Sequence, residues 1–148
     1  MTAPKMKLLL VTGPLTFDRF LMKIGGGEKV TPDLVLQGEV RWFDFGAAVG
    51  SEPQGHRPVV IIQGDELNHS RLRTTVVAPV TTSTHLSLLP GAVFIPAAVA
   101  GLTQDSVVEL WAVSTVNKWA LGSVQGVVPS TVWKKIERAM DQMMGRPA

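Results

Sequence analysis

The sequence predicts a mainly β fold of the α+β type, in which a small β-barrel is followed by a C-terminal helix. From Gly38 onward, short β-branched or alternating segments recur with Gly, Pro, Asn and Ser between them, and clear helical spacing comes near the end of the chain. The length of 148 residues, 45% of them hydrophobic, suits one domain with a sizeable core. The expected strands are residues 39–45, 58–64, 74–80, 91–95, 105–112 and 114–117.

Two of these strands have the clearest patterns. Residues 59–62 form a β-branched run that is too short for a core helix and has the right length for a strand. Residues 74–80 form a second such run, which a cluster of hydroxyl side chains follows. Pro79 cannot donate a hydrogen bond to a neighbouring strand, so it belongs at a strand end or edge.

A helix is predicted after Pro129, with Ser130 as its N-cap. Gly145 and Pro147 are expected to end it. The residues that share its apolar face are Val132, Ile136, Ala139, Met140 and Met143. We expect this face to pack on the barrel.

The composition excludes several classes of function. The chain has no cysteine, which excludes thiol nucleophiles, disulfides and thiolate metal sites. The apolar residues 8–11 are too few to span a bilayer and are interrupted by Gly13 and Pro14, so we expect a soluble, cytoplasmic protein without a membrane partner.

The charge is distributed unevenly along the chain. Residues 1–36 hold five basic and three acidic residues, whereas residues 37–148 hold nine of each. A neutral domain cannot hold a polyanion through its overall charge, so a local cluster would have to do so. Arg57, Arg71 and Arg73 are the candidates for that cluster.

Arg57 stands where a long loop enters a strand. The loop, residues 47–56, contains Gly50, Pro53 and Gly55, and connections of this length without regular structure are more often functional than accidental. Pro58 biases Arg57 towards extended backbone and so restricts the direction of its side chain. The sequence therefore predicts a positioned cation at the mouth of a buried strand.

Two motifs in this region resemble those of a known family. The first is Gly-Ser-Glu-x-x-Gly-His-Arg-Pro-Val-Val at residues 50–60, and the second is Val-x-Pro-x-Thr-Thr-Ser at residues 77–83. With residues 38–45 before them and 104–108 after them, they closely resemble the MazF/PemK family of toxin endoribonucleases over residues 37–145. The resemblance implies an SH3-like or CcdB-like β-barrel that forms a homodimer, within a toxin domain of residues 37–148.

The resemblance also implies an activity and partners. The protein would cleave single-stranded RNA, such as mRNA, at a short sequence without a metal or cofactor, leaving a 2′,3′-cyclic phosphate and a 5′-hydroxyl. The cleavage would stop translation and growth. A cognate antitoxin would neutralise the enzyme by occupying its RNA groove, and the two together would bind DNA. Base choice is expected in a dimer groove formed by residues 47–57 and 64–73.

Three residues are expected to carry the chemistry. The resemblance makes Arg57 the principal catalytic residue, and its planar guanidinium suits stabilisation of charge on phosphoryl oxygens. A guanidinium stays protonated in proteins, which argues against a role for Arg57 as a base. The resemblance also implies Thr81, whose hydroxyl would contact a phosphoryl oxygen or the 2′-hydroxyl. Glu52 is the carboxylate of the loop that is available as a base.

Further residues are expected to bind RNA. They are Ser51, Gln54, His56, Arg71, Arg73, Thr82, Ser83 and Ser114. Within this set the alternation of extended chain predicts that His56 faces away from Arg57. Ser51 could instead hold the loop. Ser114 stands where family members often have a basic residue, a difference that bears on base preference, and Lys118 could compensate.

The other two histidines and the tryptophans are expected to have mainly structural roles or to stack on bases. His69 and His85 are far apart in sequence and have no metal-ligand spacing, so no metal site is expected. Trp42 and Trp133 fall on apolar faces and are expected in the core. Trp111 and Trp119 are open to a stacking role.

Residues 1–36 lie outside the resemblance and form an N-terminal extension. Thr16 is a candidate cap for a short helix that ends at Gly25-Gly26-Gly27 and has Phe17, Phe20, Leu21 and Ile24 on one face. A flexible extension, a start codon placed too early, and a segment folding over the dimer or the RNA groove are all compatible with this sequence.

Two other functions fit a barrel of this kind. A CcdB-like toxin would poison gyrase without enzymatic activity, but it relies on a terminal Trp-Gly-Ile, and this sequence ends Gly-Arg-Pro-Ala. In a barrel that only binds nucleic acid, Arg57 would bind a backbone phosphate without contributing to cleavage.

Overall fold

The structure is a computed structural model that describes residues 22–24, 27–29, 34–47 and 49–147. β1 (Met22–Ile24) and β2 (Gly27–Lys29) form a separate antiparallel pair. The helix expected between Thr16 and Ile24 lies largely outside the described residues. Its end, Met22–Ile24, is a strand, and Gly27 begins the next strand, so this part of the helix prediction is wrong. A short apolar run does not distinguish the two structures by its spacing.

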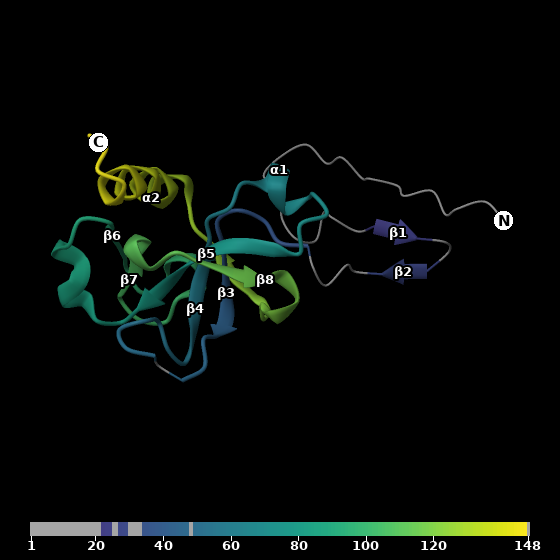
Figure 1. Ribbon diagram of the computed structural model, residues 1–148, viewed down its shortest axis with the longest axis horizontal. Coiled ribbons are helices and arrows are strands. Elements are labelled where there is room, and N and C mark those ends of the chain that lie inside the picture. The colour runs from purple at the N-terminus through teal and green to yellow at the C-terminus, as the bar shows by residue number, and fades with distance from the viewer. Residues whose placement is uncertain (1–21, 25–26, 30–33, 48, 148) are drawn as a thin grey trace.

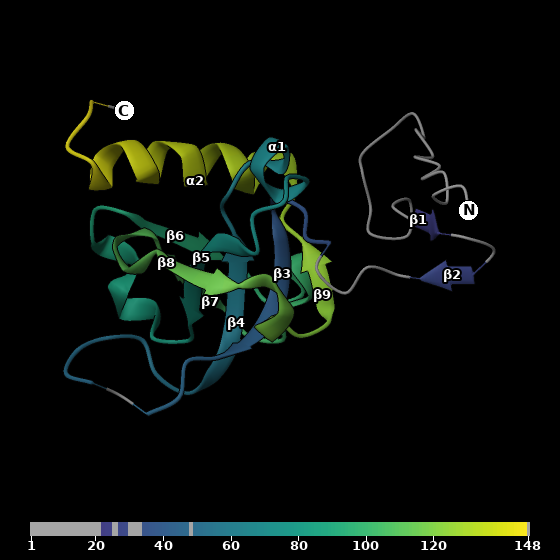
Figure 2. The ribbon, with the colours of Figure 1, turned by 45° about the vertical axis from the view of Figure 1, so that its right-hand side comes forward.

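The remaining strands form one antiparallel sheet of seven strands that curls into a half-barrel (Figures 1 and 2). The order is β6-β7-β5-β4-β3-β9, and β8 also pairs with β5. The strands are β3 (Glu39–Asp44), β4 (His56–Ile61), β5 (Thr74–Thr81), β6 (Ala92–Ile95), β7 (Ser106–Glu109), β8 (Ser114–Asn117) and β9 (Val124–Val127). The predicted mainly β fold with a C-terminal helix is confirmed.

Alternation along the strands divides the core into two clusters. On β4, Val60 belongs to the larger cluster, whereas Val59 and Ile61 belong to the smaller one with Val77. Neighbouring residues of a strand point to opposite faces of the sheet, which accounts for this division. The smaller cluster lies on the face that also carries Arg57, because Arg57, Val59 and Ile61 alternate along the same strand.

The C-terminal helix α2 (Ser130–Met143) covers the larger cluster (Figure 2). Val132, Ile136 and Ala139 are buried there, as predicted. Ser130 is the first helical residue instead of the cap, and Pro129 takes the cap position without a side-chain hydrogen bond. Gly145 has a φ of 76°, a conformation that favours glycine just beyond a helix end.

β7 and β8 follow one another along the same edge of β5. Val108 pairs with Val80, and Ser114 pairs with Val77, so three extra residues are inserted between the two pairings. These residues form the 3₁₀ turn η4 (Leu110–Ala112), where the sequence predicted a continuous strand. Trp111 and Ala112 of this turn line the pocket described below.

Three further differences from the predicted elements concern short segments. β9 and the single-turn helix α1 (Asp65–Asn68) were not predicted. β4 begins two residues earlier than expected, at His56, and ends at Ile61. The loop before β4 therefore spans residues 45–55.

Candidate active site

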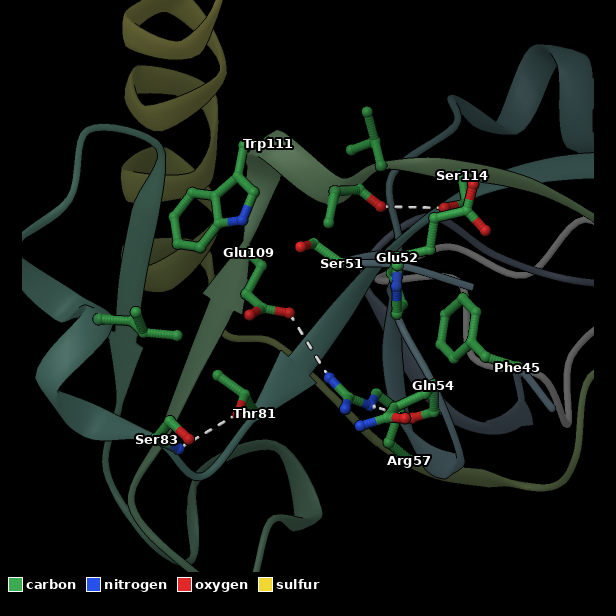
Figure 3. Close-up of a pocket in the computed structure, with 15 residues that line it drawn as sticks. Phe45, Ser51, Glu52, Gln54, Arg57, Thr81, Ser83, Glu109, Trp111 and Ser114 are labelled. Carbon is green, nitrogen blue, oxygen red and sulfur yellow. Dashed lines mark hydrogen bonds and ion pairs between the residues drawn. The ribbon is translucent and has the colours of Figure 1, made fainter. Parts of the chain in front are cut away.

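An open pocket of about 870 Å³ lies where the ends of β4, β5 and β7 meet the long loop before β4 (Figure 3). The loop contributes Glu52 and Gln54, and η4 contributes Trp111. Arg57 and Thr81 line this pocket together, as the sequence predicted for two strands lying side by side.

The register of the strands explains why these two side chains share the pocket. Val59 of β4 pairs with Pro79 of β5. Continuing this antiparallel register by two residues places Arg57 opposite Thr81, on the same face of the sheet. On the other edge of β5, Thr81 pairs with Val107 of β7, so Glu109 lies two residues further along that face.

Arg57 is held at two of its nitrogen atoms. Its Nε donates a hydrogen bond to the carbonyl oxygen of Gln54 at 3.0 Å, which ties the loop to β4. Its Nη1 lies 3.6 Å from Oε2 of Glu109. The side chain retains 25% exposure, so the guanidinium is oriented by the protein and open to solvent in the pocket.

The hydroxyl of Thr81 is held by the chain that follows it. Thr81 Oγ1 accepts a hydrogen bond from the backbone N–H of Ser83 at 3.2 Å. Accepting uses a lone pair, so the hydroxyl hydrogen remains available for an oxygen atom in the pocket. Ser114 Oγ donates to the carbonyl oxygen of Ala112 at 3.0 Å, an interaction that stabilises the start of β8 beside the pocket.

Glu109 is a site residue that the sequence analysis missed. Its side chain is 13% exposed and is directed from β7 towards Arg57 (Figure 3). Burial raises the pKa of the Glu109 carboxyl, and the positive charge of Arg57 lowers it by less. The sequence indicates that Glu109 lies on the same side of its strand as Val107. The spacing of residues along the sequence does not show which strand lies beside that one, so the approach of Glu109 to Arg57 could not be predicted.

The pocket brings together most of the predicted site residues. Those that line it are Ser51, Glu52, Gln54, Arg57, Thr81, Ser83 and Ser114. Additional lining residues, which were not among the predicted site residues, include Phe45, Leu86 and Trp111. Trp111 is 38% exposed, so an aromatic surface borders the polar groups.

Four predicted RNA-binding residues lie elsewhere. His56 stacks on Trp42 with ring centroids 4.8 Å apart, in agreement with the expectation that it faces away from Arg57. Thr82 lines a smaller cavity beside Trp42. Arg71 and Arg73 precede β5, whereas Thr81 ends it, and a strand of this length spans roughly 23 Å. Within one chain, the pocket therefore does not include these two arginines.

Metal sites and membrane-spanning helices are the other features considered for the described residues. Within the described part of the chain, no group of three or more His, Asp or Glu side chains is arranged to hold a metal ion. No helix among the residues that the structure describes is long and apolar enough to cross a membrane.

Curated proteins with sequences similar to this chain are named endoribonucleases. The chain is 38% identical over 111 residues to the endoribonuclease MazF6 of Mycobacterium tuberculosis. This alignment covers 75% of this chain and 97% of that protein. It is 32% identical over 107 residues to the endoribonuclease EndoA of Bacillus subtilis, covering 72% and 91%.

Solved structures share the fold. A mycobacterial endoribonuclease in complex with its cognate antitoxin aligns with a TM-score of 0.64 and 24% identity, over 77% of this chain and 98% of that chain. MazF from Deinococcus radiodurans aligns with a TM-score of 0.62 and 20% identity, over 76% and 97%.

The family model described as "PemK-like, MazF-like toxin of type II toxin-antitoxin system" matches residues 36–144, which include the whole seven-stranded sheet and α2. The matched segment also contains every residue that lines the pocket. The chain therefore belongs to the family of PemK-like, MazF-like toxins of type II toxin–antitoxin systems.

Proposed function

We propose that this protein is an endoribonuclease toxin that cleaves single-stranded RNA at a short sequence. The observation that carries the proposal is the meeting of the Arg57 guanidinium and the Thr81 hydroxyl in one open pocket, in a chain whose curated relatives are named endoribonucleases. A guanidinium and a hydroxyl are donors that suit the oxygen atoms of a phosphodiester.

The proposed reaction is an attack by the 2′-oxygen of the RNA on the adjacent phosphorus. The bond from phosphorus to the 5′-oxygen breaks, which leaves a 2′,3′-cyclic phosphate and a 5′-hydroxyl. Arg57 would stabilise the charge that develops on the phosphoryl oxygens, and Thr81 would donate to one of them. The donors are already positioned by the backbone of Gln54 and Ser83, so little reorganisation is needed in the transition state.

We propose that the reaction needs neither metal nor cofactor, as the family resemblance implies. The corresponding test is cleavage in the presence of EDTA. A metal-independent enzyme retains its rate, whereas an enzyme that uses Mg²⁺ to bind the phosphate loses it and recovers when the ion is added back.

The proposed partners are a second copy of the chain and a cognate antitoxin. The structural relatives include an endoribonuclease solved with its cognate antitoxin, which supports an antitoxin partner here. The exposed Arg71 and Arg73 lie outside the pocket of one chain, and we propose that they contact RNA along a groove that a homodimer extends. Cross-linking and light scattering with and without RNA test this arrangement.

The decisive experiment uses an RNA and its deoxy-substituted partner. Sequencing of 5′ ends after a brief digestion of a long transcript with the purified protein gives the cleavage site. A short oligoribonucleotide spanning that site is then compared with the same oligonucleotide carrying one 2′-deoxyribose at the cut. The proposal requires cleavage of the first and no cleavage of the second.

The other outcomes correspond to the alternative functions. A barrel that only binds nucleic acid leaves both oligonucleotides intact while retaining them in a gel-shift assay. A gyrase poison also leaves both intact and inhibits supercoiling by purified gyrase. The family match and the endoribonuclease relatives favour the nuclease over both.

A further inference from the structure

We propose that Glu109 is the general base of this site, taking the proton from the attacking 2′-hydroxyl while Arg57 holds the same phosphate. This inference rests on the proposed ribonuclease function and adds a catalytic residue to it. It is carried by the 3.6 Å approach of Glu109 Oε2 to Arg57 Nη1 inside the pocket.

The separation of the two groups fits the geometry of the reaction. An attacking 2′-oxygen stands roughly 3 to 3.5 Å from the phosphorus in a reactive arrangement. A base for that hydroxyl must therefore lie next to the group that binds the phosphoryl oxygens. Glu109 is the carboxylate that meets this condition among the described residues, because it approaches Arg57 directly.

Glu52 fits the role less well, although it lines the same pocket. It lies on the loop before β4 and is exposed, whereas the Glu109 side chain is 13% exposed and projects from β7. A strand holds a catalytic group more rigidly than a loop does. Glu52 also forms no ion pair with Arg57 in the described structure.

The electrostatic surroundings of Glu109 favour a base. Burial raises the pKa of its carboxyl and the Arg57 charge opposes this by less, so its basicity exceeds that of an ordinary glutamate. The charged residues that line the pocket within the described chain are Glu52, Arg57 and Glu109. β5 and β6, which pair with β7, carry no charged residue. The turn η2 (Thr84–Leu88) beside β7 carries His85, which is exposed and outside the pocket.

The step balances with water as the proton exchanger. The 2′-hydroxyl proton passes to the Glu109 carboxylate, and the 2′-oxygen forms a bond to phosphorus. The 5′-oxygen leaves with the electron pair of its bond and takes a proton from water, after which the Glu109 carboxyl returns its proton to solvent. Negative charge on the phosphate that Arg57 holds opposes the effect of the Arg57 charge on Glu109, which favours transfer of the proton to the Glu109 carboxylate.

The test compares Glu109→Gln with Glu52→Gln and with Glu137→Gln on the exposed face of α2. The readout is the pH profile of kcat/KM on the oligoribonucleotide spanning the mapped site, together with the affinity for its uncleavable 2′-deoxy analogue. We expect Glu109→Gln to lower kcat/KM by about 100-fold or more and to abolish the acidic limb of the profile. Its affinity for the analogue should stay within about threefold of wild type or increase, since a negative charge is removed.

The controls separate catalysis from structure. Glu52→Gln and Glu137→Gln should keep the acidic limb, and Glu109→Asp should keep it at a reduced rate. An acidic limb that persists in Glu109→Gln overturns the inference, as does a loss of analogue binding that matches the loss of cleavage. A wild-type protein that cleaves no RNA overturns the proposed nuclease function itself, and the role of Glu109 with it.

Discussion

Arg57 of β4 and Thr81 of β5 line the same pocket, and each lies two residues beyond the pairing of Val59 with Pro79. Both side chains therefore point into the same pocket from neighbouring strands. Neither position depends on the fold of the loop alone, since each residue belongs to a strand of the sheet. The two strands thus bring together the two donors that the proposed reaction needs.

Replacing Arg57 should affect cleavage more than RNA binding. We expect Arg57→Ala to lower kcat by roughly 100- to 1,000-fold, the usual cost of removing a donor that faces developing charge. Arg57→Lys should lose at least tenfold, because an ammonium lacks the planar pair of donors and the Nε bond to Gln54. Single-turnover cleavage of the mapped oligoribonucleotide measures both. Near wild-type cleavage by Arg57→Lys would contradict the role given to the guanidinium.

Replacing Thr81 tests the second donor. Thr81→Val keeps the shape of the side chain and removes the hydroxyl, and a hydrogen bond to a charged group is worth about 1.5–3 kcal/mol, so we expect cleavage to fall by roughly 10- to 150-fold. Thr81→Ser retains the hydroxyl and should stay within about fivefold of wild type. Equal rates for the valine and serine variants would exclude a role for the hydroxyl.

The adjacency of Arg57 and Thr81 was predictable from the sequence. Each residue lies at one end of a β-branched run, and two consecutive antiparallel strands usually pair. The orientation of His56 away from the site followed from alternation within the same strand. The stacking of His56 on Trp42 confirms that orientation.

Glu109 could not be found in this way, because its position depends on contacts between distant parts of the chain. Its strand β7 pairs directly with β5, although β6 lies between the two in the sequence. The three residues of η4 then interrupt the register between β7 and β8 along β5. The predicted strands 105–112 and 114–117 leave a break only at residue 113, so the spacing did not signal a turn at residues 110–112. Pairings of this kind are decided by packing of the whole sheet.

Trp111 should contribute to RNA affinity. Its ring borders the pocket and is 38% exposed, and stacking of a base on an aromatic side chain is worth about 1–3 kcal/mol. We expect Trp111→Ala to weaken binding of the 2′-deoxy analogue by roughly 5- to 150-fold. Trp111→Phe should retain most of the affinity. Trp119→Ala is the matched control, since Trp119 is also exposed and lies outside the pocket.

His56 should matter more for stability than for cleavage. Its ring lies parallel to that of Trp42, with an angle of 4° between the planes. Aromatic pairs of this kind contribute about 0.5–1.5 kcal/mol beyond the area they bury. We expect His56→Ala to lower the free energy of unfolding by about 1 kcal/mol and to reduce cleavage far less than Arg57→Ala. Urea denaturation and the cleavage assay measure the two effects, and a hundredfold loss of cleavage at wild-type stability would contradict this assignment.

We expect the titration of Glu109 to contribute to the pH dependence of the free energy of unfolding. Its pKa in the folded state is raised above the ordinary glutamate value of 4.5, mainly by burial. Between those two values the folded chain binds more protons than the unfolded chain, so the free energy of unfolding decreases as the pH rises through this range. Above the raised pKa the carboxylate is ionised in both the folded and the unfolded chain, and the full free-energy cost of burying its charge lowers the stability of the fold.

Glu109→Gln removes that titration, so the difference in unfolding free energy between variant and wild type should shift in favour of the variant as the pH rises from about 4 towards neutrality. Taking the difference cancels the contribution of Glu39, whose pKa burial also raises and which both proteins share. Urea denaturation at a series of pH values gives the two curves. Parallel curves would show that Glu109 titrates alike in the folded and unfolded chains, and an opposite slope would mean that its ion pair with Arg57 outweighs its burial.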